Sequence, residues 1–309
     1  MSQVMINELV PRRELLVSGH LACPGCGGAL AMRMVLKELG EKTMVVQPAC
    51  CWSIIAGPYP QSSLKVPIYH TAFETGSAVA SGIRAALDLQ GDTETTVMVW
   101  AGDGGTFDIG LQSLSGAAER NENVLYCCYD NEAYMNTGIQ RSSATPQGAW
   151  TTTTPAEQPQ STPKKDILGI VAAHGIPYAA TATVAHPVDL IAKVRAAKQV
   201  KGFRFLHILA PCPPGWKYAD DQSIEMARLA VRTRIFPLLE VEHGTHWRFT
   251  AEHAGEPVES YLRRQGRFRH LTDEQVCQVQ HEVDARWARL VERVEGGRLP
   301  ETELKGWSL

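Results

Sequence analysis

Asp103 and Asn131 are the two residues whose side-chain type and position most directly point to chemistry. Each follows a short apolar stretch of strand length, residues 95–101 for Asp103 and residues 124–129 for Asn131. Residues 109–120 between them have helix-like apolar spacing. The pattern predicts a βαβ unit whose parallel strands end at the same edge of a sheet. Carboxylate and amide oxygens at that edge suit Mg²⁺, which usually binds one or two protein oxygens together with phosphates.

The loop residues around these two side chains extend the same hypothesis. The backbone carbonyl of Ala133 is a candidate third oxygen ligand. Asp103 stands in the run Gly102-Asp103-Gly104-Gly105, directly before the predicted helix. Backbone N–H groups at a helix start are suited to phosphate. Glu74 precedes another predicted helix, made of small residues, where it either stabilises the helix start or contacts a ligand.

A second group of candidate residues consists of cysteines. Cys23 and Cys26 form a C-x-x-C turn, Cys50 and Cys51 follow a predicted strand at 43–47, and Cys212 follows another at 203–209. Cys23, Cys26, one of the adjacent pair and Cys212 therefore offer four thiolates from three loops. Such a set suits Zn²⁺ or a [4Fe–4S] cluster. The long separation of the third and fourth ligands favours the cluster.

Composition limits the remaining possibilities. The chain has 309 residues, 44% hydrophobic and 20% charged, with a net charge of −3. These values are typical of a globular protein and give no reason to expect nucleic-acid binding. No apolar run is long enough for a membrane span, and no signal peptide is recognisable, so we expect a cytoplasmic protein. Its eight cysteines are then thiols or metal ligands rather than disulfides.

The elements that must position these residues form an α/β pattern of alternating strands and helices. We expect a mostly parallel sheet with helices on both faces and a helical C-terminal extension. Thr272 and Gln275 form a capping box before a helix with apolar residues at 276, 279, 283, 287 and 290. Residues 1–220 are the predicted cofactor domain, and residues 221–309 an extension packed on it, with one continuous domain as the alternative. The polar loop 151–165 is expected at the surface, as a flap, a subunit contact or a solvated loop. The basic stretch 263–270 is expected to be solvated or subunit-facing.

Three long segments resemble a known family. The strings GH-x-A-C-x-G-C-G, GDGGT-x-DIGLQ-x-LSGA-x-ER and YDNEAYMNTG-x-QRSSATP are similar to the β subunit of the 2-oxoacid:ferredoxin oxidoreductases. Further strings, AAHGIPY, HILAPCPPGW and SYLRRQGRFRHLT, extend the resemblance over nearly the whole chain. The Y-M-N-T-G loop favours the branch acting on pyruvate and on branched-chain or aryl 2-oxoacids. The resemblance implies the thiamine diphosphate-binding fold.

The resemblance also implies roles for individual residues. Asp103, Asn131 and the Ala133 carbonyl would bind Mg²⁺, while the segment Gly102–Gly105 would hold the diphosphate of thiamine diphosphate. Asn136 matches the family position that faces the thiazolium and the substrate. Thr137, and more weakly Gln140 and Arg141, would line the same pocket.

For the iron–sulfur site, the resemblance implies one [4Fe–4S] cluster held by Cys23, Cys26, Cys51 and Cys212. The family has one cysteine at the position of Cys51, usually after a glycine, and Cys50 departs from that pattern. Which of the two sulfurs binds iron is therefore a question for experiment.

The implied activity is oxidative decarboxylation of a 2-oxoacid, with pyruvate first and phenylglyoxylate, a branched-chain 2-oxoacid or oxalate as alternatives. CoA would accept the acyl group, and ferredoxin or an NAD-linked subunit the electrons. The family glutamate that contacts the cofactor's aminopyrimidine lies on a partner subunit, so α-, γ- or δ-type subunits are expected partners. Alternatives are a non-oxidative thiamine diphosphate decarboxylase with structural zinc, and an electron-transfer protein that the Asp103–Asn131 pair argues against.

Overall fold

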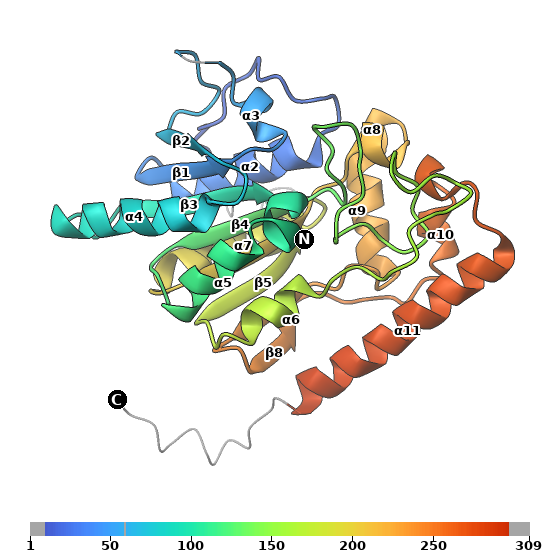
Figure 1. Ribbon diagram of the computed structural model, residues 1–309. Helices are drawn as coiled ribbons and strands as arrows, with labels where there is room; N and C mark the ends of the chain where they lie inside the picture. Colours follow the sequence, from blue (N-terminus) through green and yellow to red (C-terminus); the bar gives the residue numbers. More distant parts are fainter. Residues whose placement is uncertain (1–9, 59, 297–309) are drawn as a thin grey trace.

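One eight-stranded sheet runs through the molecule (Figure 1). The computed structural model describes residues 10–58 and 60–296. The strand order is β2-β1-β3-β4-β6-β5-β7-β8. Strands β1 to β6 pair in parallel, and β7 and β8 are antiparallel additions at one edge. The strands are β1 (Thr43–Pro48), β2 (Ile68–Thr71), β3 (Thr96–Gly102), β4 (Leu125–Asp130), β5 (Tyr178–Thr183), β6 (Arg204–Leu209), β7 (Leu239–Glu242) and β8 (His246–Phe249).

Helices cover both faces of the sheet, which confirms the predicted layered α/β fold. Side chains alternate along β3, so that Met98 and Trp100 belong to one apolar core and Val97 and Val99 to the other. Helices α2 (Gly27–Leu39) and α7 (Pro187–Gln199) pack on the first face. The second face is covered by α4 (Gly76–Leu89), α5 (Leu111–Glu119) and α6 (Ile167–Ala172).

The C-terminal segments build a third apolar core beside the sheet, centred on Trp216, Met226 and Tyr261. The predicted capping box is confirmed: the backbone N–H of Thr272 donates to the Gln275 side chain, and that of Gln275 donates to the Thr272 hydroxyl. The elements of this region are α8 (Pro213–Trp216), α9 (Ser223–Arg232), α10 (Glu259–Leu262) and α11 (Asp273–Gly296), with short 3₁₀ turns at Asp220–Gln222 and Gly266–Phe268. Because β7 and β8 continue the main sheet, the division near residue 220 stays a prediction.

Several local features differ from the sequence-based expectations. Strands β2 and β8 and the short helix α3 (Trp52–Ile55) are absent from the prediction, because their four-residue lengths are too short for a clear period. Residues Gly104–Asp108 form a π-helical turn rather than a simple glycine turn. Such turns occur mostly inside α-helices, and they are frequent at functional sites. The loop 151–165 is also not merely solvated, because Thr151 and Gln160 are buried.

Candidate functional site

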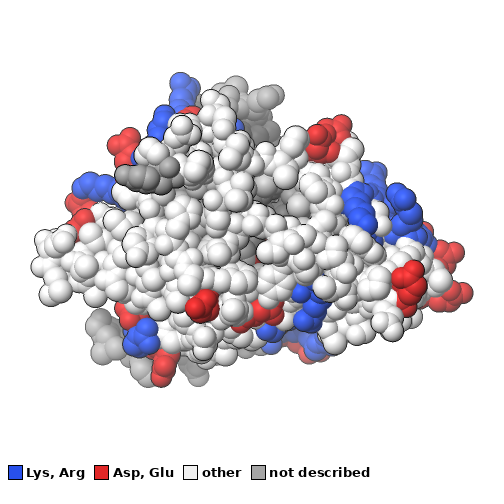
Figure 2. Space-filling model, turned by 45° about the horizontal axis from the view of Figure 1, so that its top comes forward, with Lys and Arg blue, Asp and Glu red and all other residues white. Residues whose placement is uncertain are grey.

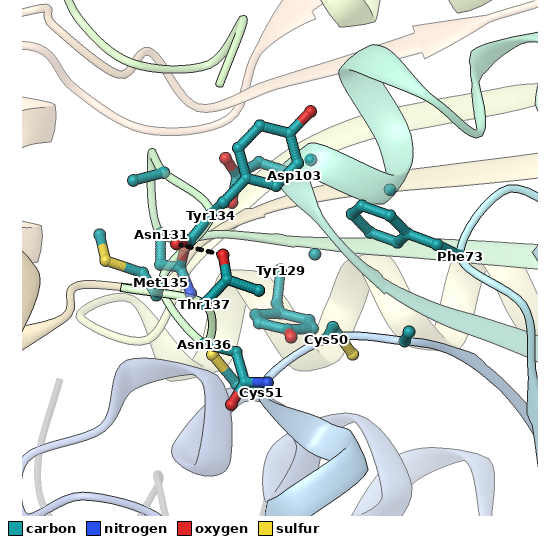
Figure 3. A pocket seen from close by; sticks show the side chains of 15 residues that line it. Cys50, Cys51, Phe73, Asp103, Tyr129, Asn131, Tyr134, Met135, Asn136 and Thr137 are labelled. Carbon is teal, nitrogen blue, oxygen red and sulfur yellow. Dashed lines mark hydrogen bonds between the residues drawn. The ribbon is translucent and has the colours of Figure 1, made fainter. Parts of the chain in front are cut away.

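A pocket of about 120 Å³ opens at the carboxyl ends of the central strands (Figure 3). In open α/β sheets ligands bind at this edge, where the strand order changes direction. Here β1 has β2 on one side and β3 on the other. The lining residues lie at or after the ends of β1, β2, β3 and β4: Ala49, Cys50, Cys51, Phe73, Gly102, Asp103, Gly104, Gly105, Tyr129, Asn131, Ala133, Tyr134, Met135, Asn136 and Thr137.

The parallel pairing of β3 with β4 brings Asp103 and Asn131 together. Gly102 is the register partner of Tyr129, so the chain leaves both strands at the same level. One terminal atom of the Asn131 amide lies 2.9 Å from Oδ1 of Asp103 and 2.9 Å from the carbonyl oxygen of Ala133. If that atom is nitrogen, both contacts are hydrogen bonds. If it is oxygen, three oxygens converge, which is the donor set that a Mg²⁺ ion takes.

The Asp103 carboxylate is fixed in a dry environment. Its side chain is buried, and the Ser142 hydroxyl donates a 2.5 Å hydrogen bond to Oδ2. Burial raises the pKa of Asp103 well above its ordinary value, and the charge of Asp130 adds to the rise, while Ser142 and Lys164 oppose it. A buried carboxylate is therefore costly in the absence of a cation. A divalent cation at this position would offset that cost, so the site fits a metal ion.

The glycines of the loop after β3 allow close aromatic packing. A Cβ at Gly104 would overlap the Tyr134 ring, and one at Gly105 would lie 3.2 Å from the Phe73 ring. The two rings pack edge to face, with their centroids 5.9 Å apart. A side chain at residue 104 therefore requires the Tyr134 ring to move, whereas one at residue 105 would meet a tight contact. The amides of this π-helical turn stand at the start of a helix, where N–H groups lack partners in the preceding turn and can bind an anion.

A network of buried charges, which we call the buried ion network, lies behind Asn131. Its members are the carboxylates of Asp130 and Glu132, the cations of Lys164 and Arg267, and His207. Lys164 Nζ is 2.5 Å from Asp130 and 2.8 Å from Glu132, Arg267 is 2.6 Å from Glu132, and His207 Nε2 is 2.7 Å from Asp130. Arg267 is thus deeply buried, and the expectation of a solvated basic stretch is wrong for this residue.

The electrostatics of the network keep Asp130 ionised. Burial raises the pKa of Asp130, but the positive charge of Lys164 and the hydrogen bond with His207 outweigh it and lower the pKa below its ordinary value. Lys164 in turn keeps a raised pKa despite its burial, because Asp130 and Glu132 flank it. Two carboxylates and two cations compensate one another; Asp130, Glu132 and Arg267 are buried, and Lys164 is partly exposed.

The four predicted cluster cysteines occupy loops that converge on one side of the pocket. The backbone N–H of Gly27, next to Cys26, donates to the Pro211 carbonyl, next to Cys212, over 3.0 Å. Burial raises the pKa of Cys212 to about 12, with the charges of Cys26 and Cys23 adding to the rise. Among the described residues, no three or more His, Cys, Asp or Glu side chains are arranged to hold a single metal ion.

Cys50 and Cys51 point to different surroundings. Burial raises the pKa of Cys51, and the charges of Cys50, Cys212 and Cys26 raise it further, so Cys51 lies toward the other cysteines. Cys50 is surrounded by other groups: the Gln47 amide donates to its sulfur over 3.8 Å, and Tyr129 and Gly102 lie beside it. Both thiols reach the pocket wall (Figure 3).

Most of the sequence-predicted residues come together at the pocket. Asn136 and Thr137 line it, and Asn136 lies beside Cys51 in Figure 3. Glu74 is not among the lining residues, and its backbone carbonyl accepts a hydrogen bond from Ser113. The side-chain oxygen of Gln140 accepts a hydrogen bond from the Thr137 hydroxyl. Arg141 turns toward the loop 151–165, where it donates to Gln160.

Sequence reasoning missed five lining residues and the buried ion network. The five are Ala49, Phe73, Tyr129, Tyr134 and Met135. Asn131 faces the pocket, while its neighbours Asp130 and Glu132 face away from it. The alternation of side chains at the end of a strand could therefore have separated the pocket-lining residues from those of the buried ion network. Their partners Lys164 and Arg267 are distant in sequence, and no local pattern points to them.

Comparison with known families places the chain in the class of thiamine diphosphate-binding proteins. A family model described as "Thiamine pyrophosphate enzyme, C-terminal TPP binding domain" matches residues 50–208; thiamine pyrophosphate is another name for thiamine diphosphate. The 2-oxoglutarate:ferredoxin oxidoreductase from Magnetococcus marinus shares the fold, with a TM-score of 0.56 and 24% identity over 69% of this chain and 79% of that chain.

Curated relatives narrow the class to one family. "Ketoisovalerate oxidoreductase subunit VorB" of Pyrococcus furiosus is 49% identical over 93% of this chain and 95% of its own length. "Pyruvate synthase subunit PorB" of Methanothermobacter marburgensis is 47% identical over 89% of this chain and 97% of its own. The chain belongs to the β subunits of the 2-oxoacid:ferredoxin oxidoreductases and is a subunit of an oxidoreductase. None of the described helices is long and apolar enough to cross a membrane.

Proposed function

We propose that this chain is the cofactor-holding subunit of an enzyme that oxidatively decarboxylates a 2-oxoacid to an acyl-CoA and CO₂. The observation that carries the proposal is the convergence of Asp103, Asn131 and the Ala133 carbonyl at the edge of a thiamine diphosphate-binding fold. Thiamine diphosphate, when bound, supplies the electron sink that allows a 2-oxoacid to lose CO₂.

The chain's own residues would bind and orient the cofactor. Asp103, Asn131 and the Ala133 carbonyl would hold Mg²⁺, which neutralises the diphosphate, and the amides of Gly104 and Gly105 would contact its oxygens. Asn136 and Thr137, from the loop after β4, would face the substrate and contribute polar groups for the oxygen that gains charge. Phe73, Tyr134 and Met135 would keep water from that side of the pocket.

A carboxylate from a partner subunit would complete the site. Among the described residues that line the pocket, Asp103 is the only carboxylate, and it already contacts Asn131 and Ser142. It therefore cannot also serve the aminopyrimidine ring, and Glu74 is not among the lining residues. We infer that an α-type subunit brings its glutamate to this edge. Exposed large apolar side chains, which suit a contact with such a subunit, lie close in sequence to the site residues. They are Leu21 beside the C-x-x-C turn, Ile54 after Cys51 and Tyr69 on β2.

A charge-poor face supports such a subunit contact. Figure 2 shows a face whose hollowed middle is largely free of Lys, Arg, Asp and Glu, while charged side chains gather toward its margins. Depletion of charge at the centre, with a charged rim, is typical of protein–protein interfaces. Further subunits, with ferredoxin or an NAD-linked subunit as acceptor, would receive the electrons.

Cys23, Cys26, Cys51 and Cys212 would hold one [4Fe–4S] cluster next to the pocket. Such a cluster, when bound, accepts electrons singly. Support comes from the contact between the loops of Cys26 and Cys212 and from the orientation of Cys51 toward them. The raised thiol pKa values mean that the thiolates need a compensating positive centre, which a metal centre supplies.

Two substrates have comparable support. Pyruvate is the first candidate, and 3-methyl-2-oxobutanoate (ketoisovalerate) is the second, because the two relatives described above, one named for each compound, are 47% and 49% identical to this chain, respectively. A substrate panel on the purified complex, with CoA and a viologen dye as acceptor, tests the proposal. We expect CoA-dependent dye reduction with one of these two acids. Consumption of the 2-oxoacid without dye reduction, together with zinc in place of iron, would instead establish a non-oxidative decarboxylase.

A further inference from the structure

Residue 132 stands between two of the proposed Mg²⁺ ligands, Asn131 and Ala133. Its backbone has φ 69°, in the left-handed region that a side-chain-bearing residue seldom adopts. This conformation turns the chain sharply, and the Asn131 side chain lies between Oδ1 of Asp103 and the Ala133 carbonyl, 2.9 Å from each. A non-glycine residue keeps such a conformation only where its surroundings impose it.

Three polar contacts hold Glu132 in this conformation. Its carboxylate forms ion pairs with Arg267 at 2.6 Å and with Lys164 at 2.8 Å. Its backbone carbonyl accepts a 2.8 Å hydrogen bond from the Thr145 hydroxyl. Glu132 and Arg267 are both buried, so neither partner exchanges readily with water. Charge-assisted hydrogen bonds in such a setting are among the stronger ones in proteins.

Arg267 also supports the neighbouring residue. Its guanidinium carbon lies 4.1 Å from the centroid of the Trp216 ring, and the Trp216 indole N–H donates a 2.8 Å hydrogen bond to the Asn131 carbonyl. One C-terminal side chain therefore contacts both the carboxylate of residue 132 and the ring that holds residue 131. These contacts join the 3₁₀ turn at Gly266–Phe268, helix α8 and the loop after β4.

We propose that Glu132 is a positioning residue, whose carboxylate, held by Arg267 and Lys164, keeps its backbone left-handed and so aims the Asn131 and Ala133 oxygens at the cation that binds the cofactor's diphosphate. Glu132 itself contacts neither the cation nor the substrate. The inference rests on the proposed function, because it assumes that thiamine diphosphate binds here with Mg²⁺.

Two variants separate this mechanism from a simple charge effect. Glu132→Ala and Glu132→Gly both remove the carboxylate, but only glycine adopts a positive φ without steric cost. We expect Glu132→Ala to raise at least tenfold the Mg²⁺ concentration needed for half-maximal thiamine diphosphate binding, and Glu132→Gly to recover much of that loss. Equal losses in both variants would overturn the backbone mechanism.

A matched control addresses general destabilisation. Glu240 is also buried and paired with an arginine, Arg248, at 2.6 Å, but it lies on β7, away from the pocket. Glu240→Gln should lower the melting temperature and leave the Mg²⁺ requirement within twofold of the wild type. If Glu132→Ala changes only the melting temperature, as Glu240→Gln does, the positioning role is wrong.

The measurement is calorimetric titration of thiamine diphosphate into the assembled complex at a series of Mg²⁺ concentrations, with turnover recorded in parallel. Saturating Mg²⁺ should restore most of the turnover of Glu132→Ala. If neither residue-132 variant folds, Arg267→Met decides: a raised Mg²⁺ requirement supports the proposal, and an unchanged one contradicts it. A wild-type complex that binds no thiamine diphosphate at any Mg²⁺ concentration would refute the proposed function itself, which is a different result.

Discussion

Asp103 and Asn131 lie 28 residues apart in sequence, yet their side chains approach to 2.9 Å at the ends of two adjacent parallel strands. The approach joins a buried carboxylate, which is unfavourable alone, to the side-chain amide of Asn131, whose backbone carbonyl accepts a hydrogen bond from the Trp216 indole. A cation between these groups would relieve the cost of burying the carboxylate. The Asp103 carboxylate therefore destabilises the fold in the absence of a cation, but it favours binding of the cation and the cofactor.

The first prediction follows from that opposition. Asp103→Asn should raise the melting temperature of the chain freed of metal and cofactor, because an uncharged amide is less costly to bury than a carboxylate. The same change should weaken Mg²⁺-dependent thiamine diphosphate binding by at least about 100-fold, or roughly 3 kcal/mol. Thermal melts with and without Mg²⁺ and the cofactor measure both effects. Asp284→Asn, at an exposed position of α11, is the control and should change neither. An unchanged cofactor affinity in Asp103→Asn would contradict the assignment.

The second prediction compares two glycines. A methyl group at Gly104 would overlap the Tyr134 ring, whereas one at Gly82, on the exposed side of α4, meets nothing within 4 Å. Gly104→Ala should destabilise the chain by about 1–3 kcal/mol through overpacking and reduce cofactor binding. Gly82→Ala should stabilise the isolated chain by about 0.5–1 kcal/mol, because alanine favours a helix. Denaturant unfolding checks both values, and equal effects would show that the loop accommodates the added methyl group.

A third prediction distinguishes the adjacent cysteines. Cys51→Ser should lose most of the iron and the absorbance near 400 nm, because Cys51 faces the other cysteines, while Cys50→Ser should keep both. Iron and sulfide analysis of anaerobically purified protein is the measurement. Retention of a full cluster in Cys51→Ser together with its loss in Cys50→Ser would reverse the assignment.

A fourth prediction concerns acid stability. The ring nitrogen Nε2 of His253 accepts a 2.9 Å hydrogen bond from the Leu238 backbone, and burial, with the charge of Arg234, lowers the pKa of His253 to about 4. The unfolded chain therefore binds more protons than the folded chain between about pH 6.5 and pH 4. Stability is complete above this window and falls as the pH falls through it. The melting temperature of the wild type should drop more between pH 7 and pH 5 than that of His253→Gln, and parallel curves would contradict this.

The sequence predicted those features that depend on local pattern and strand order. Asp103 and Asn131 were recognisable because each follows a buried strand, and parallel pairing makes adjacent strand ends neighbours. The capping box at Thr272 was recognisable for the same local reason. By contrast, the partners of Glu132 come from residues 164 and 267, and their convergence depends on how a long loop and the C-terminal region pack. Tertiary packing of this kind leaves no periodic signal in the sequence.

We infer that this chain holds the cofactor but supplies only half of the active site. The test is to measure acyl-CoA formation by the isolated chain, loaded with thiamine diphosphate and Mg²⁺ and with the proposed cluster in place, using a 2-oxoacid, CoA and a viologen dye. We expect no turnover until the partner subunit that carries the glutamate is added, and turnover afterwards. Sustained acyl-CoA synthesis by the isolated chain would show that its own residues suffice and would contradict the account.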